Sequence, residues 1–346
     1  MIYSIMNWKK SVALSFLLVA AVAAIVFSCT YSSCQPAAAM VQTEKKSDYI
    51  KYVEFNPPYN ALDKALSIDV AAQAKGIKRS WIELLAYLAA KYGGDFSRYK
   101  STDMDALVKK LDAGQTMEQL TKGSKYYSYY FKAYTAVLGG LVGEYKIQVP
   151  DKNNPSLVTW QEKYGLMGFS PIAKGYPFVH FDDFGAQRTY GYARQHLGHD
   201  LMAATGTPVI AVESGVVEAL GWNQYGGWRI GIRSFDKQRY YYYAHLRQNR
   251  PYAANLTVGQ TVKAGDVIGY VGHTGYSTKE NANNIDVSHL HFGLQLIFDE
   301  SQKECNNEIW VDVYPLTMLL NRNRSEVYKD ADTKEYYRKY DIQIDG

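Results

Sequence analysis

The stretch that decides the fold is Thr207–Leu220, TPVIAVESGVVEAL, in which two short runs rich in β-branched residues are separated by Glu-Ser-Gly. β-Branched side chains favour strands, and small or polar residues with glycine favour tight turns. Similar short runs follow as far as residue 296, and no long helical pattern alternates with them. This pattern of short runs predicts a mostly antiparallel β domain and disfavours a parallel, doubly wound sheet.

Helical signals precede this strand-rich region. Ser80 and Glu83 form a capping-box pattern ahead of an apolar run that ends at a glycine pair. Two further helices are expected from Asp103 to Leu111 and from about Lys125 to Leu138. No catalytic constellation stands out among them, so residues 49–150 are predicted to form a small α-helical domain with a packing, spacing or binding role.

An apolar segment at 11–28 follows Lys9 and Lys10. Its length is close to the roughly 20 residues that cross a bilayer as a helix, and it is longer than a usual signal-peptide core. The flanking lysines predict a cytoplasmic N-terminus at 1–10 and an exported remainder. We therefore expect a single-pass membrane anchor with the folded part on the extracytoplasmic side. A lipid anchor at Cys29 and a fully secreted form are the alternatives.

Length and composition set further bounds. The 346 residues suit two folded units plus appendages. A net charge of +4 without a basic block gives no support to a nucleic-acid partner. Three cysteines provide neither a disulfide framework nor a cysteine-based zinc site, so histidines and carboxylates must hold any metal. The remaining expected segments are a linker at 29–48, the strand-rich domain at 151–320 and a polar tail at 321–346.

Histidines gather in three motifs of the strand-rich region, namely His196-Leu-Gly-His-Asp200, Tyr-Ala-His245-Leu and His289-Leu-His291-Phe. Alternate residues of a strand point to one face, so His289 and His291 can share a site. A catalytic zinc takes three nitrogen or oxygen ligands and keeps one open position. His196, Asp200 and His291 would supply such a set. Each motif alone is commonplace, but the three together in one region indicate a metal site.

These motifs and their glycine-rich surroundings resemble the lysostaphin-type (LytM-type) zinc endopeptidase family over roughly residues 180–297. The resemblance implies that His196, Asp200 and His291 bind one Zn²⁺ while His245 and His289 are the catalytic histidines. It also implies a mostly antiparallel β fold with a long groove, and peptidoglycan stem peptides or cross-bridges as substrate. The same pattern runs through Gly206–Val209, Ala211–Val217, Val258–Gly265 and Gly269–Ser277.

The function expected on this basis is that of a membrane-tethered, extracytoplasmic zinc metalloendopeptidase that hydrolyses peptidoglycan peptide bonds during cell-wall remodelling. The alternative is a protein of the same fold that is catalytically silent and serves as an envelope scaffold or as an activator of other hydrolases. A degenerate member normally lacks a zinc ligand, whereas this sequence keeps every candidate ligand. That observation favours an enzyme.

Three segments are expected to shape the groove. Arg247–Leu256 and Lys279–Val287 are longer than the corresponding links in many relatives, and both are expected to line it. Phe169–Tyr190, rich in aromatic residues and aspartate, is read either as another groove wall or as an ordered loop that covers a sheet edge. Tyr190 is implied, by the resemblance, to hydrogen bond the tetrahedral intermediate.

Overall fold

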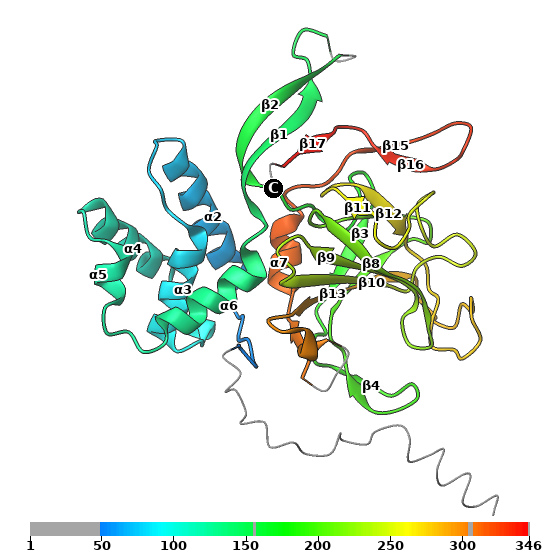
Figure 1. The fold of residues 1–346 in the computed structure, drawn as a ribbon, viewed down its shortest axis with the longest axis horizontal. Coiled ribbons are helices and arrows are strands. Elements are labelled where there is room, and N and C mark those ends of the chain that lie inside the picture. Colours follow the sequence, from blue (N-terminus) through cyan, green and yellow to red (C-terminus); the bar gives the residue numbers. More distant parts are fainter. Residues whose placement is uncertain (1–48, 155–156, 304–306, 345–346) are drawn as a thin grey trace, which may run out of the picture. The chain divides into compact units, whose positions relative to one another are not determined.

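Helices occupy the first part of the residues that the computed structural model describes, which are 49–154, 157–303 and 307–344 (Figure 1). The helices expected around Leu84, Leu107 and Tyr134 are confirmed as α3, α4 and α6, whereas α2 was not anticipated. The bounds are α2 Tyr59–Gln73, α3 Trp81–Tyr92, η1 Phe96–Arg98, α4 Ser101–Asp112, α5 Met117–Thr121 and α6 Tyr127–Leu138.

The ends of α3 show how the helical signals act. Ser80 occupies the N-cap position, but its side chain makes no capping hydrogen bond. The amide of Trp81 donates instead to the Asp69 carboxylate of α2 at 2.8 Å, which ties the two helices together. Gly93 ends the helix with φ of 65°, a left-handed conformation that glycine adopts without a steric penalty.

The membrane prediction concerns residues that the structure does not describe. The expected anchor at 11–28, the cytoplasmic N-terminus at 1–10 and the linker at 29–48 all lie outside the described residues. Within the described part of the chain, none of the helices combines the length and the apolar character that a bilayer span requires.

An antiparallel sheet forms the second half of the fold and confirms the expected mostly antiparallel β class. Its strand order is β11-β8-β9-β10-β13-β6-β3, and β14 pairs with β13 off this path. β13 is central, because it pairs with β10 and β6 and all eight of its residues are buried. The bounds are β3 Phe178–Phe181, β6 His199–Ala203, β8 Gly215–Asn223, β9 Gly227–Ser234, β10 Arg239–Ala244, β11 Thr261–Val262, β13 His289–Leu296 and β14 Ile309–Val311.

The tyrosine-rich strand β10 shows how the sheet divides its side chains. Tyr241 and Tyr243 are fully buried on the core face, where the Tyr243 hydroxyl accepts a hydrogen bond from the Val212 amide at 3.0 Å. Tyr240 and Tyr242 point to the other face, where they line a groove. Strand periodicity therefore assigns alternate tyrosines to the core and to the groove.

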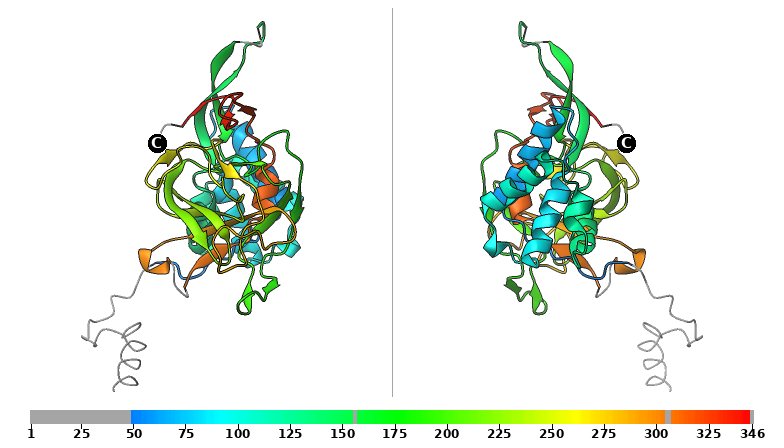
Figure 2. Two further views of the ribbon diagram at one scale, coloured as in Figure 1. Left: turned by 90° about the vertical axis from the view of Figure 1, so that its right-hand side faces the viewer. Right: turned by 90° about the vertical axis from the view of Figure 1, so that its left-hand side faces the viewer.

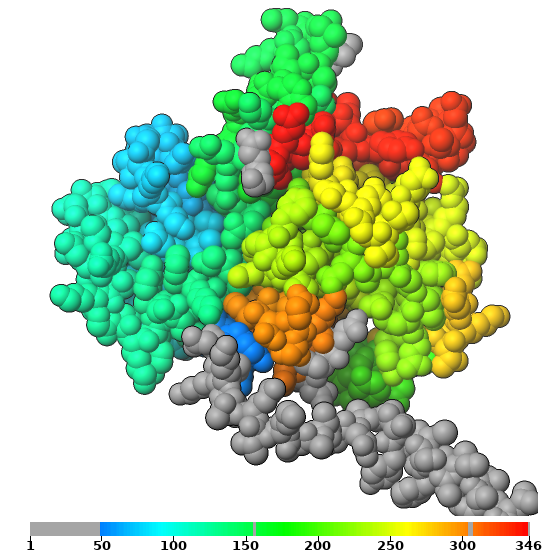
Figure 3. All heavy atoms as spheres, viewed as in Figure 1, coloured from blue at the N-terminus to red at the C-terminus, as the bar shows by residue number. Residues whose placement is uncertain are grey.

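Smaller sheets flank this main sheet. β1 and β2 form a long hairpin that projects from the body (Figures 1 and 3), and β17 adds to its β1 edge. The segment 321–346, expected to be a polar tail, thus contributes three short strands. The remaining bounds are β1 Val142–Pro150, β2 Val158–Leu166, β4 Gln187–Arg188, β5 Arg194–Gln195, β7 Pro208–Ile210, β12 Val267–Tyr270, η2 Glu300–Gln302, α7 Tyr314–Leu320, β15 Val327–Lys329, β16 Tyr336–Arg338 and β17 Ile342–Gln343.

The larger of the two apolar clusters among the described residues runs through helices and sheet. Buried residues of α3 and α6, such as Leu85 and Val137, belong to the same cluster as Ile232 of β9 and Leu320 of α7. Helix α7 contacts α2 and lies between the helices and the sheet (Figures 1 and 2). The expected domain boundary at residue 150 falls at the end of β1, inside a paired hairpin. Helices and sheet are therefore packed as one unit from residue 49 onward.

A buried ion pair joins the end of α6 to the sheet. The Arg239 guanidinium donates from Nε and Nη2 to the two Glu213 carboxylate oxygens at 2.7 and 3.0 Å. Its Nη1 donates to the Ala136 carbonyl of α6 at 2.8 Å, and the Tyr241 hydroxyl donates to Glu213 at 2.6 Å. Gly140 allows this close approach, because a Cβ there would lie 1.8 Å from the Glu213 carboxylate.

We expect Glu213→Ala to lower the free energy of unfolding by about 3–5 kcal/mol, since it removes the buried counter-charge of the Arg239 guanidinium and leaves only the half-exposed Asp236 carboxylate. Chemical unfolding followed by circular dichroism measures this change. Glu326→Ala is the matched control, because Glu326 pairs with Lys174 at the surface and its loss should cost less than about 1 kcal/mol. Equal losses for the two variants would contradict the assigned importance of the buried pair.

Candidate metal centre

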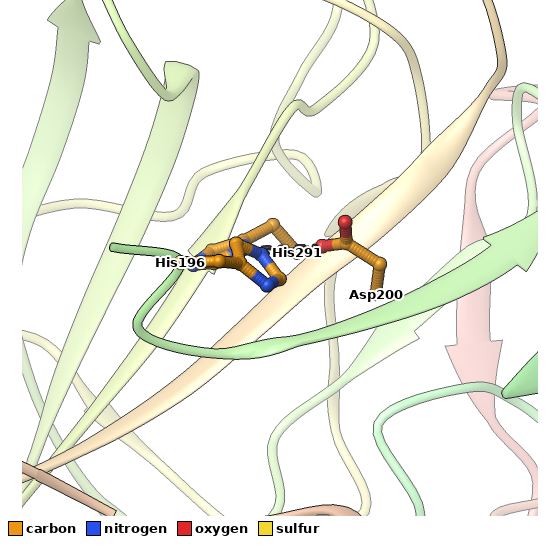
Figure 4. A group of neighbouring side chains, drawn as sticks. All are labelled: His196, Asp200 and His291. Carbon is orange, nitrogen blue, oxygen red and sulfur yellow. Dashed lines mark hydrogen bonds and ion pairs between the residues drawn. The ribbon is translucent and has the colours of Figure 1, made fainter. Parts of the chain in front are cut away.

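The structure brings together the three residues predicted as metal ligands. His196, Asp200 and His291 each offer one ligand atom, and these atoms all lie within 4.8 Å of one another. Nε2 of His196 is 2.7 Å from Nδ1 of His291, and both nitrogens are 3.1 Å from Oδ1 of Asp200. Figure 4 shows the three side chains turned towards one another. Two imidazoles and one carboxylate at this spacing can hold a metal ion.

Strand pairing creates this convergence. His291 of β13 lies directly opposite Asp200 of β6, so both side chains share one face of the sheet. His196 precedes β6 in a turn that returns its ring to the same point. Gly198 in that turn is needed for steric reasons, because a Cβ there would lie 2.5 Å from the His291 ring. The spacing His-x₃-Asp therefore includes a glycine that makes room for the third ligand.

The protonation states of these groups follow from their surroundings. Burial opposes charge on His196, but the carboxylates of Asp183 and Asp200 outweigh it and raise its pKa to about 9. Burial alone would raise the pKa of Asp200, yet His196 and His291 hold that pKa well below its usual range. Burial lowers the pKa of His291 and that of His245. At neutral pH, Asp200 is thus anionic while His291 and His245 are neutral.

Asp183 supports the site from outside the ligand set. Nδ1 of His196 lies 3.2 Å from the Asp183 carbonyl oxygen and 3.0 Å from its carboxylate. Because both partners only accept, Nδ1 carries a proton, and release of the second proton from Nε2 leaves that nitrogen for a metal. Arg188 donates to the Asp183 carboxylate and reaches Asp200 at 3.4 Å. No sequence motif predicts this role for Asp183, whose only signal is its place in an aspartate-rich loop.

Asp183→Asn should weaken zinc binding by about 10- to 100-fold, the usual cost of losing a partner that orients a ligand histidine. Competition with a chromogenic chelator measures this affinity. The neighbouring Asp182→Asn provides a control with the same chemistry at an exposed position. Unchanged affinity in the Asp183 variant would show that the loop backbone alone orients His196.

The two predicted catalytic histidines lie beside these ligands and share one tautomer. Nδ1 of His245 hydrogen bonds to the Thr274 carbonyl at 2.9 Å, and Nδ1 of His289 hydrogen bonds to the Val287 carbonyl at 2.8 Å. Carbonyl oxygens only accept, so each Nδ1 is protonated and each Nε2 of a neutral ring has a free lone pair. The two rings are 4.8 Å apart, and the His245 ring is 5.7 Å from that of His291.

His245 is held in an uncommon backbone conformation. Its φ is 60°, in the left-handed region that non-glycine residues rarely occupy. The amide of His245 donates to the Gly226 carbonyl at 2.7 Å, and the Gly272 amide donates to the His245 carbonyl at 3.0 Å. These bonds keep the residue in place at the end of β10. Such local strain is often found where a fold orients a functional side chain.

These groups lie in a groove of about 610 Å³. Tyr276 lines it with its ring 5.9 Å from that of His245, while Tyr190 stacks on Tyr276 at 5.0 Å and is not among the lining residues. Tyr276 therefore lies beside His245, whereas Tyr190, expected to hydrogen bond the tetrahedral intermediate, packs against Tyr276. The groove is lined by Arg188, Arg194–Leu197, Asp200, Asn223, Tyr225, Gly226, Arg229, Tyr240, Tyr242, His245, Tyr276, His289, His291, Gln295, Lys303, Glu308 and Trp310.

The two long loops do not line this groove, contrary to expectation. They pack on each other instead, because the Asn281 side chain accepts from the Asn249 amide at 2.9 Å and from the Trp228 indole at 2.9 Å. Of the segment Phe169–Tyr190, only Arg188 reaches the groove. Polar composition alone does not distinguish a loop that faces substrate from one that hydrogen bonds to a neighbouring loop.

The remaining histidines lie away from the ligand atoms, as expected. His199 is buried and points to the opposite side of β6, where its Nε2 is 2.8 Å from Nδ1 of His180. Burial lowers the pKa of His199 to about 4. Nδ1 of His273 donates to the Ile285 carbonyl at 2.8 Å. The structure gives none of the three a place in the metal centre.

Known proteins are similar to the part of the chain that contains His196, Asp200 and His291. A family model described as peptidase family M23 matches residues 194–305. An L-Ala–D-Glu endopeptidase of Bacillus subtilis is 43% identical over 124 residues, which are 36% of this chain and 36% of that protein. Lysostaphin of Staphylococcus staphylolyticus is 41% identical over 98 residues, 28% of this chain and 18% of that protein.

A crystal structure of lytM from Ruminococcus gnavus is 21% identical and covers 77% of this chain and 88% of that chain, with a TM-score of 0.49. The matched part spans about a third of the Bacillus protein and less than a fifth of lysostaphin. The residues matched by the family model, 194–305, include His196, Asp200 and His291.

Proposed function

Because residues 194–305 match peptidase family M23, we propose that the chain is a zinc metalloendopeptidase that hydrolyses peptide bonds of peptidoglycan. The observation that carries the proposal is the convergence of three buried ligand atoms in a groove that also holds two further imidazoles. The relatives' names support a peptide substrate in the cell wall. They specify different bonds, an L-Ala–D-Glu bond for the Bacillus protein and a glycyl-glycine bond for a Staphylococcus capitis endopeptidase that is 40% identical over 98 residues. The bond cut by this chain is therefore left open.

The donor set fits zinc. Three nitrogen and oxygen ligands with one open side form the usual catalytic arrangement, and Asp183 leaves Nε2 of His196 free to coordinate. A bound Zn²⁺ would polarise a peptide carbonyl and acidify a water molecule. One ion would be held by His196, Asp200 and His291.

The two neighbouring histidines would provide the proton chemistry. His245 is neutral and has a free Nε2 lone pair, so it can accept a proton from an attacking water. His289 has the same tautomer and lies on the same strand face as His291. It can orient the water or, once protonated, donate to the developing oxyanion. Tyr276 lies beside them and offers a hydroxyl donor to a substrate in the groove.

We further propose that residues 11–28 tether the protein to a membrane with its peptidase part on the extracytoplasmic side. Their apolar character and the two preceding lysines support this arrangement. A peptidoglycan substrate is also consistent with it, since that polymer lies outside the cytoplasmic membrane. Fusing a reporter to the C-terminus that is active only outside the cytoplasm would test the orientation.

Incubating the protein with purified peptidoglycan tests the proposed activity. We expect soluble fragments whose release stops when a chelator removes the metal and resumes when zinc is restored. Mass spectrometry of the fragments identifies the bond that is cut. If the folded, zinc-loaded protein released nothing from several wall types, the envelope-scaffold alternative would replace the enzymatic one.

A further inference from the structure

Arg229 occupies the groove face of the sheet in line with the metal centre. Its neighbour Ile230 is fully buried on the core face, opposite Tyr243 of β10. Because side chains alternate along a strand, Arg229 points to the other face, and it does line the groove. Ala244 is the next residue of β10 beyond Tyr243, and it lies opposite His291 of β13.

This arrangement forms one row across four neighbouring strands, from Arg229 through Ala244 and His291 to Asp200. Strands β9, β10 and β13 lie side by side in Figure 1. The residue between the arginine and the ligand histidine is an alanine, so no long side chain separates them. Two strand spacings place the Arg229 backbone about 10 Å from that of His291, a distance that about three residues of extended peptide would cover.

The Arg229 guanidinium differs from the other cations of the groove in its lack of partners. Arg188 is paired with Asp183, and Lys303 is paired with Glu218. Arg194 donates to the Tyr190 carbonyl at 2.7 Å and stacks over the Tyr225 ring at 4.7 Å. Among the described residues, Arg229 makes neither a side-chain hydrogen bond nor an ion pair, and its Nε is buried without any partner.

An unpartnered arginine in this position has a clear ligand preference. A buried donor that lacks an acceptor costs free energy, and an entering acceptor removes that cost. The guanidinium fork matches a carboxylate with two parallel hydrogen bonds. Two acidic side chains share this lining. Asp200 is already held between His196 and His291, and Glu308 already accepts from the Trp310 indole at 2.7 Å. The acceptor for Arg229 is therefore expected to come from the substrate.

We propose that Arg229 is a specificity-determining residue that binds a free carboxylate of a peptidoglycan stem peptide. The inference rests on the proposed function and names the substrate class within it. Stem peptides carry carboxylates on their glutamate residue and at their C-terminus, whereas a glycine cross-bridge offers none within its chain. The enzyme should thus select stem peptides whose carboxylate is free over amidated stem peptides and glycine bridges.

Three synthetic peptides test this selection, namely L-Ala-γ-D-Glu-L-Lys-D-Ala and its two mono-amides at the glutamate α-carboxyl and at the C-terminus. They are compared with the zinc-loaded full-length protein by kcat/KM where cleavage occurs and by NMR titration in every case. We expect one amide to be disfavoured by about 10- to 100-fold, the usual effect of losing a charge-assisted hydrogen-bonded pair. Arg229→Gln should remove that difference, and Arg229→Lys should restore part of it.

Arg98→Gln removes the same charge from an exposed position that does not line the groove, and it should keep the wild-type preference. The inference is overturned if the wild-type protein binds all three peptides equally, or if Arg229→Gln keeps the preference. Binding that discriminates between the peptides without cleavage of any substrate would support the role of Arg229 while refuting the proposed activity. Cleavage of free and amidated peptides at equal rates would support the proposed activity while refuting the role of Arg229.

Discussion

His291→Ala is expected to abolish zinc binding and peptidase activity together. The variant removes Nδ1, which is one of three ligand atoms and lies 2.7 Å from the nearest other ligand atom. Two remaining ligands do not hold a catalytic zinc firmly, and polarisation of the scissile carbonyl by the metal contributes several kcal/mol to catalysis. Activity should therefore fall by at least about a thousandfold.

Zinc content by atomic emission and fragment release from peptidoglycan measure the two effects on the same preparation. His273→Ala is a matched control, because it removes a partly buried imidazole that binds only the Ile285 carbonyl outside the metal centre. That control should keep one zinc per chain. Stoichiometric zinc in the His291 variant would show that the ligand set is wrongly assigned.

His289→Ala should separate metal binding from catalysis. Its Nε2 is 3.8 Å from the Asp200 carboxylate, and His289 is not one of the three residues whose ligand atoms converge. The variant is therefore expected to keep its zinc. Loss of a positioned acid–base group should lower kcat by about 10²- to 10⁴-fold.

The control for this experiment is the zinc content of the variant itself, measured beside its rate. An inactive variant that has also lost zinc would make His289 a support for the ligands instead of a catalytic group. Full activity in a zinc-loaded variant would refute the division of roles between His289 and His291.

The sequence predicted the strand-rich half of the fold and the convergence of His196, Asp200 and His291 well, because both depend on local patterns. Alternation along β13 places His289 and His291 on one face without any knowledge of distant residues. The motif around His196 and Asp200 has a spacing that a single turn can close. In each of these motifs, the residues with functional side chains also lie in the short segment whose local conformation orients them.

Features that depend on packing between distant segments could not be predicted from the sequence in the same way. Asp183 supports His196 only because the loop before β4 folds back on the turn before β6. The long loops Arg247–Leu256 and Lys279–Val287 could be recognised as insertions, but hydrogen bonds between them turn them away from the groove. The continuous core of helices and sheet depends on α7, a short helix that comes late in the chain.

The pairing of His291 with Asp200 across 91 residues also has a consequence for the synthesis and folding of the chain. A ribosome must finish β13 before any chain has a complete ligand set, and β13 must then dock on β6. Closing such a long loop is slow compared with forming a helix, so the three candidate ligands come together only late in folding. A metal ion bound by them would then stabilise the docked strand and couple metal binding to the completion of the fold.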